Sequence, residues 1–372
     1  MSGSALIWIG IVLGALLAFL VVEFILLAVV LVLEDQKTLG LGYYGLPPVE
    51  RERYRRRLRR QAALLAPILR VLALFSKFSF AKASFHHHGL AGPKGTCSPE
   101  SFAQAEAYQP TAADVFVATQ MKCGTTWMLH VVYQVLRRGA GDLVASGSTL
   151  HAVCPWIEGR KTVTLAGAPL VGDERPARII KTHFPASHCP YSPDARYIYV
   201  ARHPVSCFAS CADFIAENAG RLAPPRELIE QWFCSDREMW WGTWPAHVQG
   251  WWDLSRRRDN VLFVRFEDMK QDLASVVREV SRFLGRAPLS DTELAAVVQQ
   301  CSFAYMQEHD EAFEMHPPQL LGADAALFVR GTADRYRDVP EDLRGRLLAW
   351  CTERMRGSDL PLERLYPVTS DH

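Results

Sequence analysis

The stretch Thr119-Gln-Met-Lys-Cys-Gly-Thr-Thr-Trp127 decides the fold of this chain. It follows directly on an apolar run typical of a buried strand, Asp114–Ala118, and it opens a helical segment, Met128–Leu136. A strand, a tight loop and a helix start leave backbone N–H groups unpaired at the helix N-terminus, where the helix dipole and the Lys122 ammonium add positive charge. The stretch therefore predicts a loop that binds an anion.

The order of residues in this loop excludes a Walker A loop, because the spacing GxxxxGK[ST] is absent and the lysine precedes the glycine. The loop resembles the 5′-phosphosulfate-binding loop of the cytosolic-type sulfotransferases, usually TYPKSGTTW. These enzymes take their sulfuryl group from 3′-phosphoadenosine-5′-phosphosulfate (PAPS). Cys123 stands where the family has serine. Its thiol is either activated by the helix N-terminus and Lys122, which would lower its pKa, or, as we favour, simply fills a serine-sized space.

Five further segments resemble motifs of the same family and follow in the family's order. They are Arg178–Pro185 (RxIKTHLP), Tyr197–Pro204 with Ser210 (IYVARNPxDxxxS), Gly242–Trp252 (GSWxxHVxGWW), Asn260–Lys270 (a strand, then YEDMK), and Phe328–Gly331 with Met355–Leu360 (RKGxxGDW and the last helix). The resemblance covers residues 100–367. The chain is identified as a member of this family that carries an added N-terminal membrane anchor.

Strand signals recur in four places and alternate with helical patterns. This alternation predicts an α/β fold with a central parallel sheet and helices on both faces, which is the P-loop-like fold that the resemblance implies. Ligands of such sheets bind at the carboxyl ends of the strands, where Lys122, His183 and Arg202 fall. The strands are expected at Asp114–Ala118, Arg178–Thr182, Arg196–Ala201 and Asn260–Phe266, and helices at Met269–Leu284, Leu289–Gln300 and Pro340–Arg356.

The resemblance implies four catalytic residues. His183 matches the family's general base, which takes the proton of the acceptor, and an imidazole pKa of roughly 6.5 suits that task. Lys122 and Lys181 match two lysines placed at the bridging oxygen and the sulfuryl group, where fixed positive charge stabilises the departing phosphate. Ser210 matches a serine that contacts the 3′-phosphate and tempers the lysine until the acceptor binds.

The resemblance also implies which residues hold PAPS. The aromatic rings among them match those around adenine, although each ring alone is also typical of a core. The residues are Lys122, Cys123, Gly124, Thr125, Thr126, Trp127, Arg202, Ser210, Phe266, Cys301, Phe303, Arg330 and Gly331.

The C-terminal segment departs from the family pattern. Val329 stands where the family has an arginine that binds the 3′-phosphate. We therefore expect Arg202 to carry more of that contact, with Arg330 or Arg335 as a compensating cation.

The composition indicates a globular protein with a membrane element, since 49% of the 372 residues are hydrophobic and 22% are charged. A net charge of +1, with the basic residues clustered in one short segment, gives no sign of nucleic-acid binding. Nine cysteines without a CxxC pair indicate a reducing compartment. No His/Cys spacing is typical of zinc, and we interpret His86-His-His88 as part of a loop or linker, so no metal is expected.

The segment Ala5–Leu33 contains one charged residue and, at 29 residues, exceeds the roughly 20 that a spanning helix needs. No basic residue precedes it, seven arginines follow between residues 51 and 60, and it lacks the basic start and short apolar run of a signal peptide. The sequence therefore predicts an uncleaved single-pass anchor with the catalytic part in the cytoplasm, where PAPS is made. Gly10, Gly14 and Ala18 form a small-residue face that either pairs two helices in a homodimer or reflects the usual composition of spanning helices.

Three regions are predicted along the chain: an anchor at 1–35, a juxtamembrane segment at 36–99 and a catalytic domain at 100–368. Within the second region, Arg51–Ala83 begins as an arginine-rich helix and becomes apolar. This pattern is typical either of a helix on an anionic membrane surface or of a helix that packs on the catalytic domain. Gly89–Pro99 is expected to be a linker.

These features predict a membrane-anchored sulfotransferase that moves a sulfuryl group from PAPS to a hydroxyl or amine. The alternative is a catalytically silent membrane scaffold that binds PAPS or another nucleotide, and the presence of His183 with both lysines argues against it. The acceptor is expected to contact loops at 140–175 and 217–241. Four aromatic residues in the second loop favour a small apolar or lipid-like acceptor, unless these rings belong to the core: Trp232, Phe233, Trp240 and Trp241.

Overall fold

Four parallel strands form the centre of the protein, in the spatial order β4-β3-β5-β6. The computed structural model describes residues 3–37, 42–75, 80–160, 162–219, 224–314, 335–361 and 365. The strands lie within one residue of their predicted ranges, which confirms the α/β fold with a parallel sheet. They are β3 (Asp114–Thr119), β4 (Arg178–Thr182), β5 (Arg196–Ala201) and β6 (Val261–Arg265).

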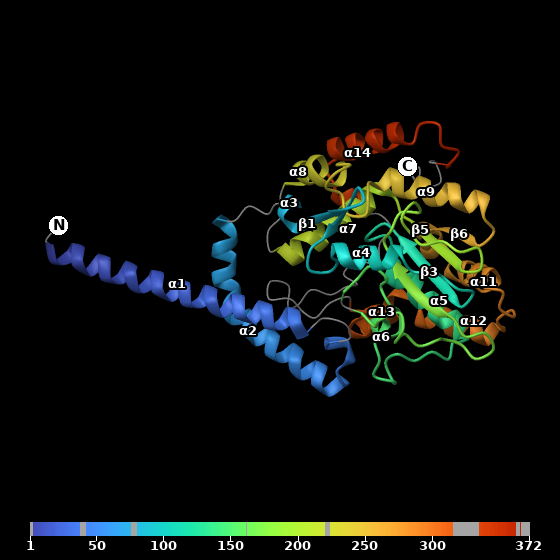
Figure 1. Cartoon of the computed structure of the whole chain (residues 1–372), viewed down its shortest axis with the longest axis horizontal. Coiled ribbons are helices and arrows are strands. Elements are labelled where there is room, and N and C mark those ends of the chain that lie inside the picture. Colours follow the sequence, from blue (N-terminus) through green and yellow to red (C-terminus); the bar gives the residue numbers. More distant parts are fainter. Residues whose placement is uncertain are drawn as a thin grey trace.

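The sheet contributes side chains alternately to two apolar cores, one on each face. Val115 and Val117 of β3 belong to one core, and Phe116 and Ala118 belong to the other. Helices cover both faces, as predicted (Figure 1). Those of the first core are α5 (Thr125–Leu136), α11 (Leu273–Phe283) and α12 (Asp291–Gln300), and those of the second are α4 (Pro99–Glu106), α7 (Pro204–Ala219), α9 (Trp244–Arg257) and α14 (Glu341–Arg354).

The prediction of a single helix at Met269–Leu284 is wrong. The structure has two helices there, α10 (Phe266–Gln271) and α11, because Asp272 ends the first and caps the second. The Asp272 carboxylate accepts a hydrogen bond from the Ser275 N–H at 3.0 Å and so satisfies one of the donors that a helix N-terminus leaves unpaired. Helices α12 and α14 begin and end within two residues of their predicted bounds.

The segment predicted as a linker, residues 89–99, is instead part of the folded domain. Strands β1 (Ser84–His87) and β2 (Leu90–Pro93) form an antiparallel hairpin, so His86 and His87 lie in a strand rather than a loop. Leu90 and Ala91 are buried in the same core as α7 and α9. The prediction failed because strands of four residues that contain glycine and proline carry no readable periodicity.

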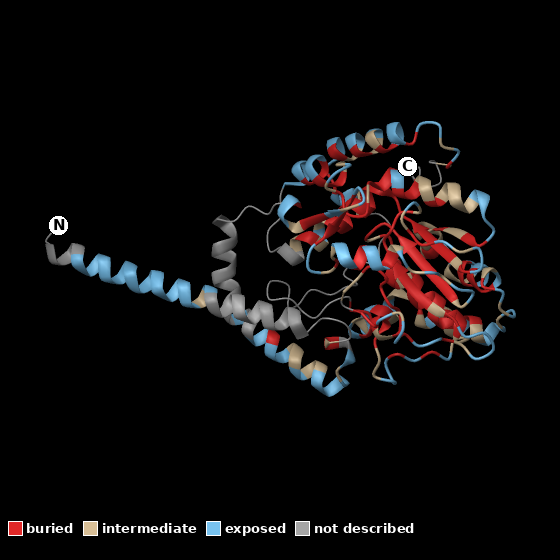
Figure 2. Cartoon of the chain, viewed as in Figure 1, coloured by how far each residue is buried: buried red, intermediate tan, exposed pale blue. Residues whose placement is uncertain are grey.

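Helix α1 (Gly3–Lys37) extends away from the folded domain that surrounds the sheet (Figure 1). Its stretch Ile7–Phe24 has a mean hydropathy of 2.5, and none of it is buried (Figure 2). The helix is therefore long and apolar enough to cross a membrane.

Helix α2 (Pro48–Phe75) begins against the folded domain that surrounds the sheet. The Arg51 guanidinium donates to the Gly147 carbonyl at 2.7 Å, and Arg55 forms an ion pair with the Glu314 carboxylate. Leu58 is buried. This segment was predicted either to lie on a membrane surface or to pack on the domain, and the first turns of α2 support packing on the domain. Most side chains of the apolar half of α2 lie outside the described residues.

Short elements complete the described part of the chain. They are η1 (Tyr43–Gly45), α3 (Phe80–Ala83), α6 (Leu150–Val153), α8 (Pro225–Leu228), the π-helical turn η2 (Ile229–Phe233), α13 (Phe303–Glu308), η3 (Asp310–Ala312) and η4 (Arg335–Asp338).

Candidate active site

Residues singled out in the sequence follow directly on the four parallel strands. Lys122 comes after β3, His183 after β4, Arg202 after β5 and Phe266 after β6. Because the strands are parallel and adjacent, their carboxyl ends meet at one edge of the sheet. The fold therefore gathers these four residues at one site.

The loop between β3 and α5 is shaped for an anion. Lys122 and Gly124 have left-handed backbone conformations, with φ of 62° and 96°. The N-cap residue Gly124 has no side chain to bond the first turn of α5, which contains Thr125 and Thr126. The Thr125 hydroxyl is already paired with the Thr119 hydroxyl at 2.6 Å. Backbone N–H groups, the Thr126 hydroxyl and the positive end of the helix dipole can thus act on a phosphate group.

Three hydrogen bonds hold His183 in place. Its Nδ1–H donates to the Thr119 carbonyl at 2.9 Å, which leaves Nε2 as the proton-accepting nitrogen. Its backbone N–H donates to the Glu158 carboxylate at 2.6 Å, and its carbonyl accepts from the His247 Nε2–H at 2.9 Å. Burial and the Lys181 ammonium hold the pKa of His183 well below its ordinary value. A neutral imidazole of fixed tautomer and orientation is what a general base requires.

Two tryptophans form the wall around the His183 imidazole. The ring centroids of Trp156 and Trp241 lie 5.4 Å and 4.8 Å from that of His183. Trp241 has a φ of 59°, an uncommon conformation for a bulky residue and one that clusters at functional sites. The surroundings of the imidazole are therefore apolar and closely packed.

Lys181 carries its ammonium group into the interior beside this wall. The residue is 1% exposed, and its Nζ lies 3.8 Å from the Trp156 ring centroid with no hydrogen-bond partner among the described residues. Burial lowers the pKa of Lys181 to about 7, an effect that the Glu158 carboxylate opposes. Because a buried ammonium group without an acceptor is costly, the position suits an anionic ligand.

Glu158 is a functional candidate that the sequence analysis missed. It is fully buried, in a segment that runs beside β4 and in which the Ile157 N–H donates to the Lys181 carbonyl at 3.0 Å. The Glu158 carboxylate binds the backbone of His183 and raises the pKa of Lys181, so one acidic group acts on both. The only signal in the sequence was a single acidic residue at the end of the apolar run 154–157.

Arg202 lies between the anion-binding loop and Phe266. Its guanidinium donates to the Lys122 carbonyl at 2.9 Å, and its Cζ lies 4.4 Å from the centroid of the Phe266 ring. The Arg202 Nε is buried and has no hydrogen-bond partner among the residues the structure describes. Ser210 is also buried, two turns along α7 from its start. Arg202 is thus fixed on one side and still has a donor for a ligand.

The rings predicted to surround adenine lie near the start of α5. The centroids of Trp127 and Phe266 are 5.6 Å apart, with the rings at 73°. The Trp127 Nε1–H donates to the Cys301 carbonyl at 2.8 Å, so Cys301 positions this ring through its backbone while its side chain is buried. Lys270, which the sequence analysis did not select, places its Nζ 5.9 Å from the Trp127 ring and 5.5 Å from the Phe303 ring.

Cys123 is fully buried, with its Sγ 3.6 Å from the Sγ of Cys207. Burial raises the pKa of the Cys123 thiol, so the helix N-terminus does not activate it. The structure therefore supports the interpretation that this residue fills space. All nine cysteines of the chain are free.

The C-terminal part of the predicted donor site is only partly described. Arg330 and Gly331 lie outside the described residues. Arg335 forms ion pairs with Asp213 and Asp338, and Asp213 lies one turn beyond Ser210 on α7. Arg335 is therefore already paired with two carboxylates.

The aromatic residues of the second predicted acceptor loop divide between core and site. Trp232 and Phe233 are fully buried, and Trp232 stacks on Phe80 with centroids 4.9 Å apart. The Trp240 Nε1–H donates to the Ser84 hydroxyl at 2.8 Å. These three residues belong to the core, and Trp241 contacts His183.

Comparison with known proteins identifies the family of this chain. The model of the sulfotransferase domain matches residues 112–359. The chain belongs to the sulfotransferase domain family. It is therefore an enzyme that transfers sulfuryl groups.

Curated relatives of this chain include sulfotransferases 2B1 and 1C2. Human sulfotransferase 2B1 is 30% identical over 254 residues, which cover 66% of this chain and 67% of that protein. Mouse sulfotransferase 2B1 is 30% identical over 68% of this chain and 74% of its own length. Human sulfotransferase 1C2 is 27% identical over 56% of this chain and 71% of its own length.

Solved structures show the same fold at lower identity. Mouse sulfotransferase SULT7A1, solved in complex with PAP, superposes with a TM-score of 0.57 at 21% identity, over 74% of this chain and 96% of that one. Retinol dehydratase, solved with androsterone and the inactive cofactor PAP, superposes with a TM-score of 0.59 at 19% identity, over 77% of this chain and 95% of that one.

We predict that Gly124→Ala lowers transfer activity at least about tenfold while the fold persists. A Cβ at this position would lie 2.7 Å from Phe266, and the left-handed backbone would add roughly 1–3 kcal/mol of strain. Steady-state kinetics measures the transfer activity, and circular dichroism measures whether the fold persists. Gly95→Ala is the matched control, because Gly95 also has a positive φ, of 89°, but a Cβ there meets nothing within 4 Å. Equal activity in the two variants would contradict the assignment of the loop.

We predict that Glu158→Gln shifts the pH profile of kcat/KM. Lys181, with a pKa of about 7, is charged below that pH and loses its charge as the pH rises. Removing the Glu158 carboxylate lowers this pKa further, so the alkaline limb moves to lower pH. Ser101→Ala is the control, since the Ser101 hydroxyl bonds the backbone carbonyl of Glu158 and the backbone of Ser98, and its loss leaves the Glu158 carboxylate in place. Superimposable profiles for Glu158→Gln and the unaltered enzyme would show that Glu158 is merely structural.

Proposed function

We propose that the protein transfers the sulfuryl group of PAPS to the hydroxyl or amine of a small apolar acceptor, with His183 as the general base. The observation that carries this proposal is the buried Lys181 ammonium, without a hydrogen-bond partner among the described residues, beside a neutral histidine of fixed tautomer. A protein that only binds the nucleotide would have no need of a neutral histidine placed to accept a proton. This argues against the nucleotide-binding scaffold.

The reaction follows from these positions. The acceptor hydroxyl gives its proton to His183 Nε2, and the oxygen lone pair forms a bond to sulfur. The bond between sulfur and the bridging phosphate oxygen breaks, and its electron pair stays on that oxygen, so that PAP leaves with the added negative charge. Lys122 and Lys181 stabilise this charge, in a site where burial strengthens electrostatic interactions.

The donor would be held from the anion-binding loop outward. The first turn of α5, with Thr125 and Thr126, suits the 5′-phosphosulfate, and the rings of Trp127 and Phe266 suit adenine. The Arg202 Nε, buried without a hydrogen-bond partner among the described residues, supports its role at the 3′-phosphate. PAP in the solved structures of mouse SULT7A1 and retinol dehydratase supports the same choice of donor.

The acceptor should be apolar because the base lies among aromatic rings. Trp156 and Trp241 contact the His183 ring, and a charged acceptor would lose its hydration there without a charged partner. Retinol dehydratase is known from structures with androsterone and with retinol, which are apolar alcohols.

We predict that His183→Ala lowers turnover by about 10²–10⁴, the scale for loss of a general base, with little change in PAPS affinity. Release of adenosine 3′,5′-bisphosphate in the presence of a small phenol measures turnover, and calorimetry measures donor binding. His188→Ala is the control, because this nearby histidine is only half-buried and bonds the His88 carbonyl rather than the groups around His183. Donor binding without any release by the unaltered protein would favour the scaffold. Near-normal release by His183→Ala would exclude His183 as the base.

We further propose that α1 anchors the enzyme in a membrane, with residues 1–4 outside and the catalytic domain in the cytoplasm. The exposed apolar stretch Ile7–Phe24 supports the anchor, and the arginines between 51 and 60 support the orientation. Cytoplasmic placement also gives the enzyme direct access to PAPS.

The orientation predicts the result of protease protection in sealed right-side-out vesicles. External protease should remove an epitope fused before Met1 and leave the catalytic domain intact. Arg51 and Arg55 form the contacts between α2 and the domain. A variant that keeps both residues therefore tests the orientation without disturbing those contacts. Changing the five exposed arginines to glutamine should produce a mixed orientation. These five are Arg53, Arg56, Arg57, Arg59 and Arg60. Digestion of the domain in the unaltered chain would overturn the proposal.

A further inference from the structure

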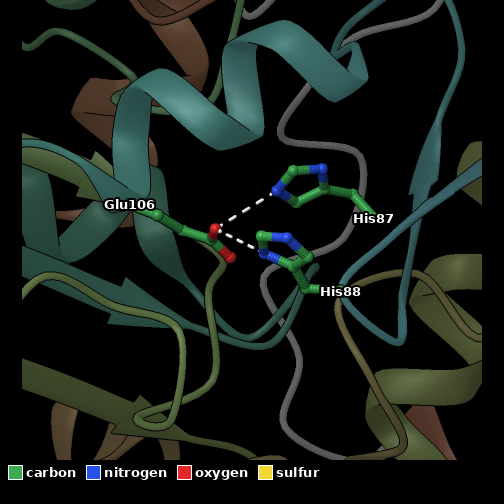
Figure 3. Close-up of side chains that lie close together, drawn as sticks. All are labelled: His87, His88 and Glu106. Atoms are coloured by element: carbon green, nitrogen blue, oxygen red, sulfur yellow. Dashed lines mark hydrogen bonds and ion pairs between the residues drawn. The ribbon is translucent and has the colours of Figure 1, made fainter.

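Two histidines and a glutamate meet beside the β1–β2 hairpin, away from the residues assigned to catalysis. The Glu106 Oε2 lies 3.2 Å from His87 Nε2 and 2.9 Å from His88 Nδ1 (Figure 3). The three potential ligand atoms all lie within 4.8 Å of one another. They come from three places in the fold: the end of β1, the hairpin turn and the end of α4.

The backbone brings the two imidazoles to the same side. Consecutive residues of a strand point to opposite faces, but His88 has a φ of 46°, which turns its side chain back toward that of His87. The two ring centroids are 4.0 Å apart. His86, on the other hand, is bonded elsewhere, with its Nε2 3.0 Å from the Arg237 carbonyl. The histidine tract therefore contributes two of its three rings to one carboxylate.

We propose that His87, His88 and Glu106 bind a zinc ion. Zinc is held by imidazole nitrogen and carboxylate oxygen at about 2.0–2.2 Å, so the ligand atoms of a tetrahedral site lie about 3.3 Å apart. The two distances from Glu106 Oε2 are close to that spacing, and the two imidazole nitrogens lie within 4.8 Å of each other, so the three atoms can converge on one ion. Three protein ligands leave the fourth position to water, and His88, with its side chain 70% exposed, leaves a path from solvent.

The charge at the site favours a cation. Among the described residues, the ion pairs of Glu106 are those with His87 and His88, and no lysine or arginine neutralises it. With both imidazoles neutral, the cluster carries one negative charge. The donor set of two nitrogens and one carboxylate suits zinc better than calcium or magnesium, which prefer oxygen ligands.

Zinc here would join the hairpin to α4 and so stiffen one wall of the acceptor site. The hairpin holds Trp241 in place, because the Trp241 N–H donates to the Ala91 carbonyl of β2 at 2.8 Å. On α4, Phe102 packs against Phe184, the residue after the predicted base, with ring centroids 4.8 Å apart. The inference goes beyond the proposed function, and binding of zinc does not depend on that function.

The test uses the full-length protein in detergent, freed of metal by a chelator. It is titrated with zinc chloride alone, and calorimetry measures the binding. We expect one ion per chain, and a rise in the unfolding temperature when zinc is added. His88→Ala is the main variant, because an exposed side chain can be removed without disturbing the core. It should weaken zinc binding by more than about tenfold and abolish the thermal shift, as should Glu106→Gln.

His86→Ala is the matched control, since it removes a histidine of the same tract that does not face Glu106. Cobalt chloride as a second probe separates this site from the cysteines, because thiolate ligation gives charge-transfer bands that nitrogen and oxygen ligands lack. Full affinity in both His88→Ala and Glu106→Gln would overturn the proposal. An equal loss in His86→Ala, a thiolate spectrum, or less than one ion for every two chains would overturn it as well.

Discussion

The constraint on which the site depends is a lysine ammonium buried beside the predicted base. Lys181 lies near the end of the edge strand β4, where β3 holds the main chain on one side and the segment that contains Pro155 and Ile157 holds it on the other, and its side chain is buried. An isolated buried charge is strongly unfavourable. The protein balances it with Glu158, whose carboxylate is also bonded to the His183 backbone. The charge and the base are therefore positioned by one acidic residue.

Much of this arrangement can be predicted from the sequence, because the sheet is built from contiguous apolar runs. Each of the four strands is five or six residues long. Nearly all side chains of β3, β4 and β5 are buried, β6 is partly buried, and each strand is followed by a residue with a predicted chemical role. The order of the motifs along the chain then places Lys122, His183 and Arg202 at one edge of the sheet. Local pattern and tertiary position coincide here, so the family resemblance and the physical reasoning lead to the same residues.

The residues that the sequence did not reveal act through contacts between distant segments. Glu158 lies in a loop without periodicity, and its role exists only because that loop runs beside β4. Trp241 was one of several tryptophans, and its strained backbone rather than its identity sets it apart. Glu106 lies on an ordinary surface helix and gains interest only when His88 turns back toward it. The same limit explains the hairpin that was taken for a linker. It follows that a soluble form should begin before residue 80, because β1 and β2 belong to the domain.

The pKa values of Lys181 and His183 are linked in a way that suits the order of events in transfer. In the protein alone, Lys181 has a pKa of about 7 and is only partly charged at neutral pH. An anionic donor placed beside it favours the ammonium form and raises that pKa, so the positive charge becomes complete as the donor binds. The same charge is one cause of the lowered pKa of His183. Burial, together with the charge on Lys181, therefore favours the unprotonated imidazole that the acceptor requires, and the lysine carries its charge when the phosphate oxygen departs. Both properties follow from burying one cation next to one histidine.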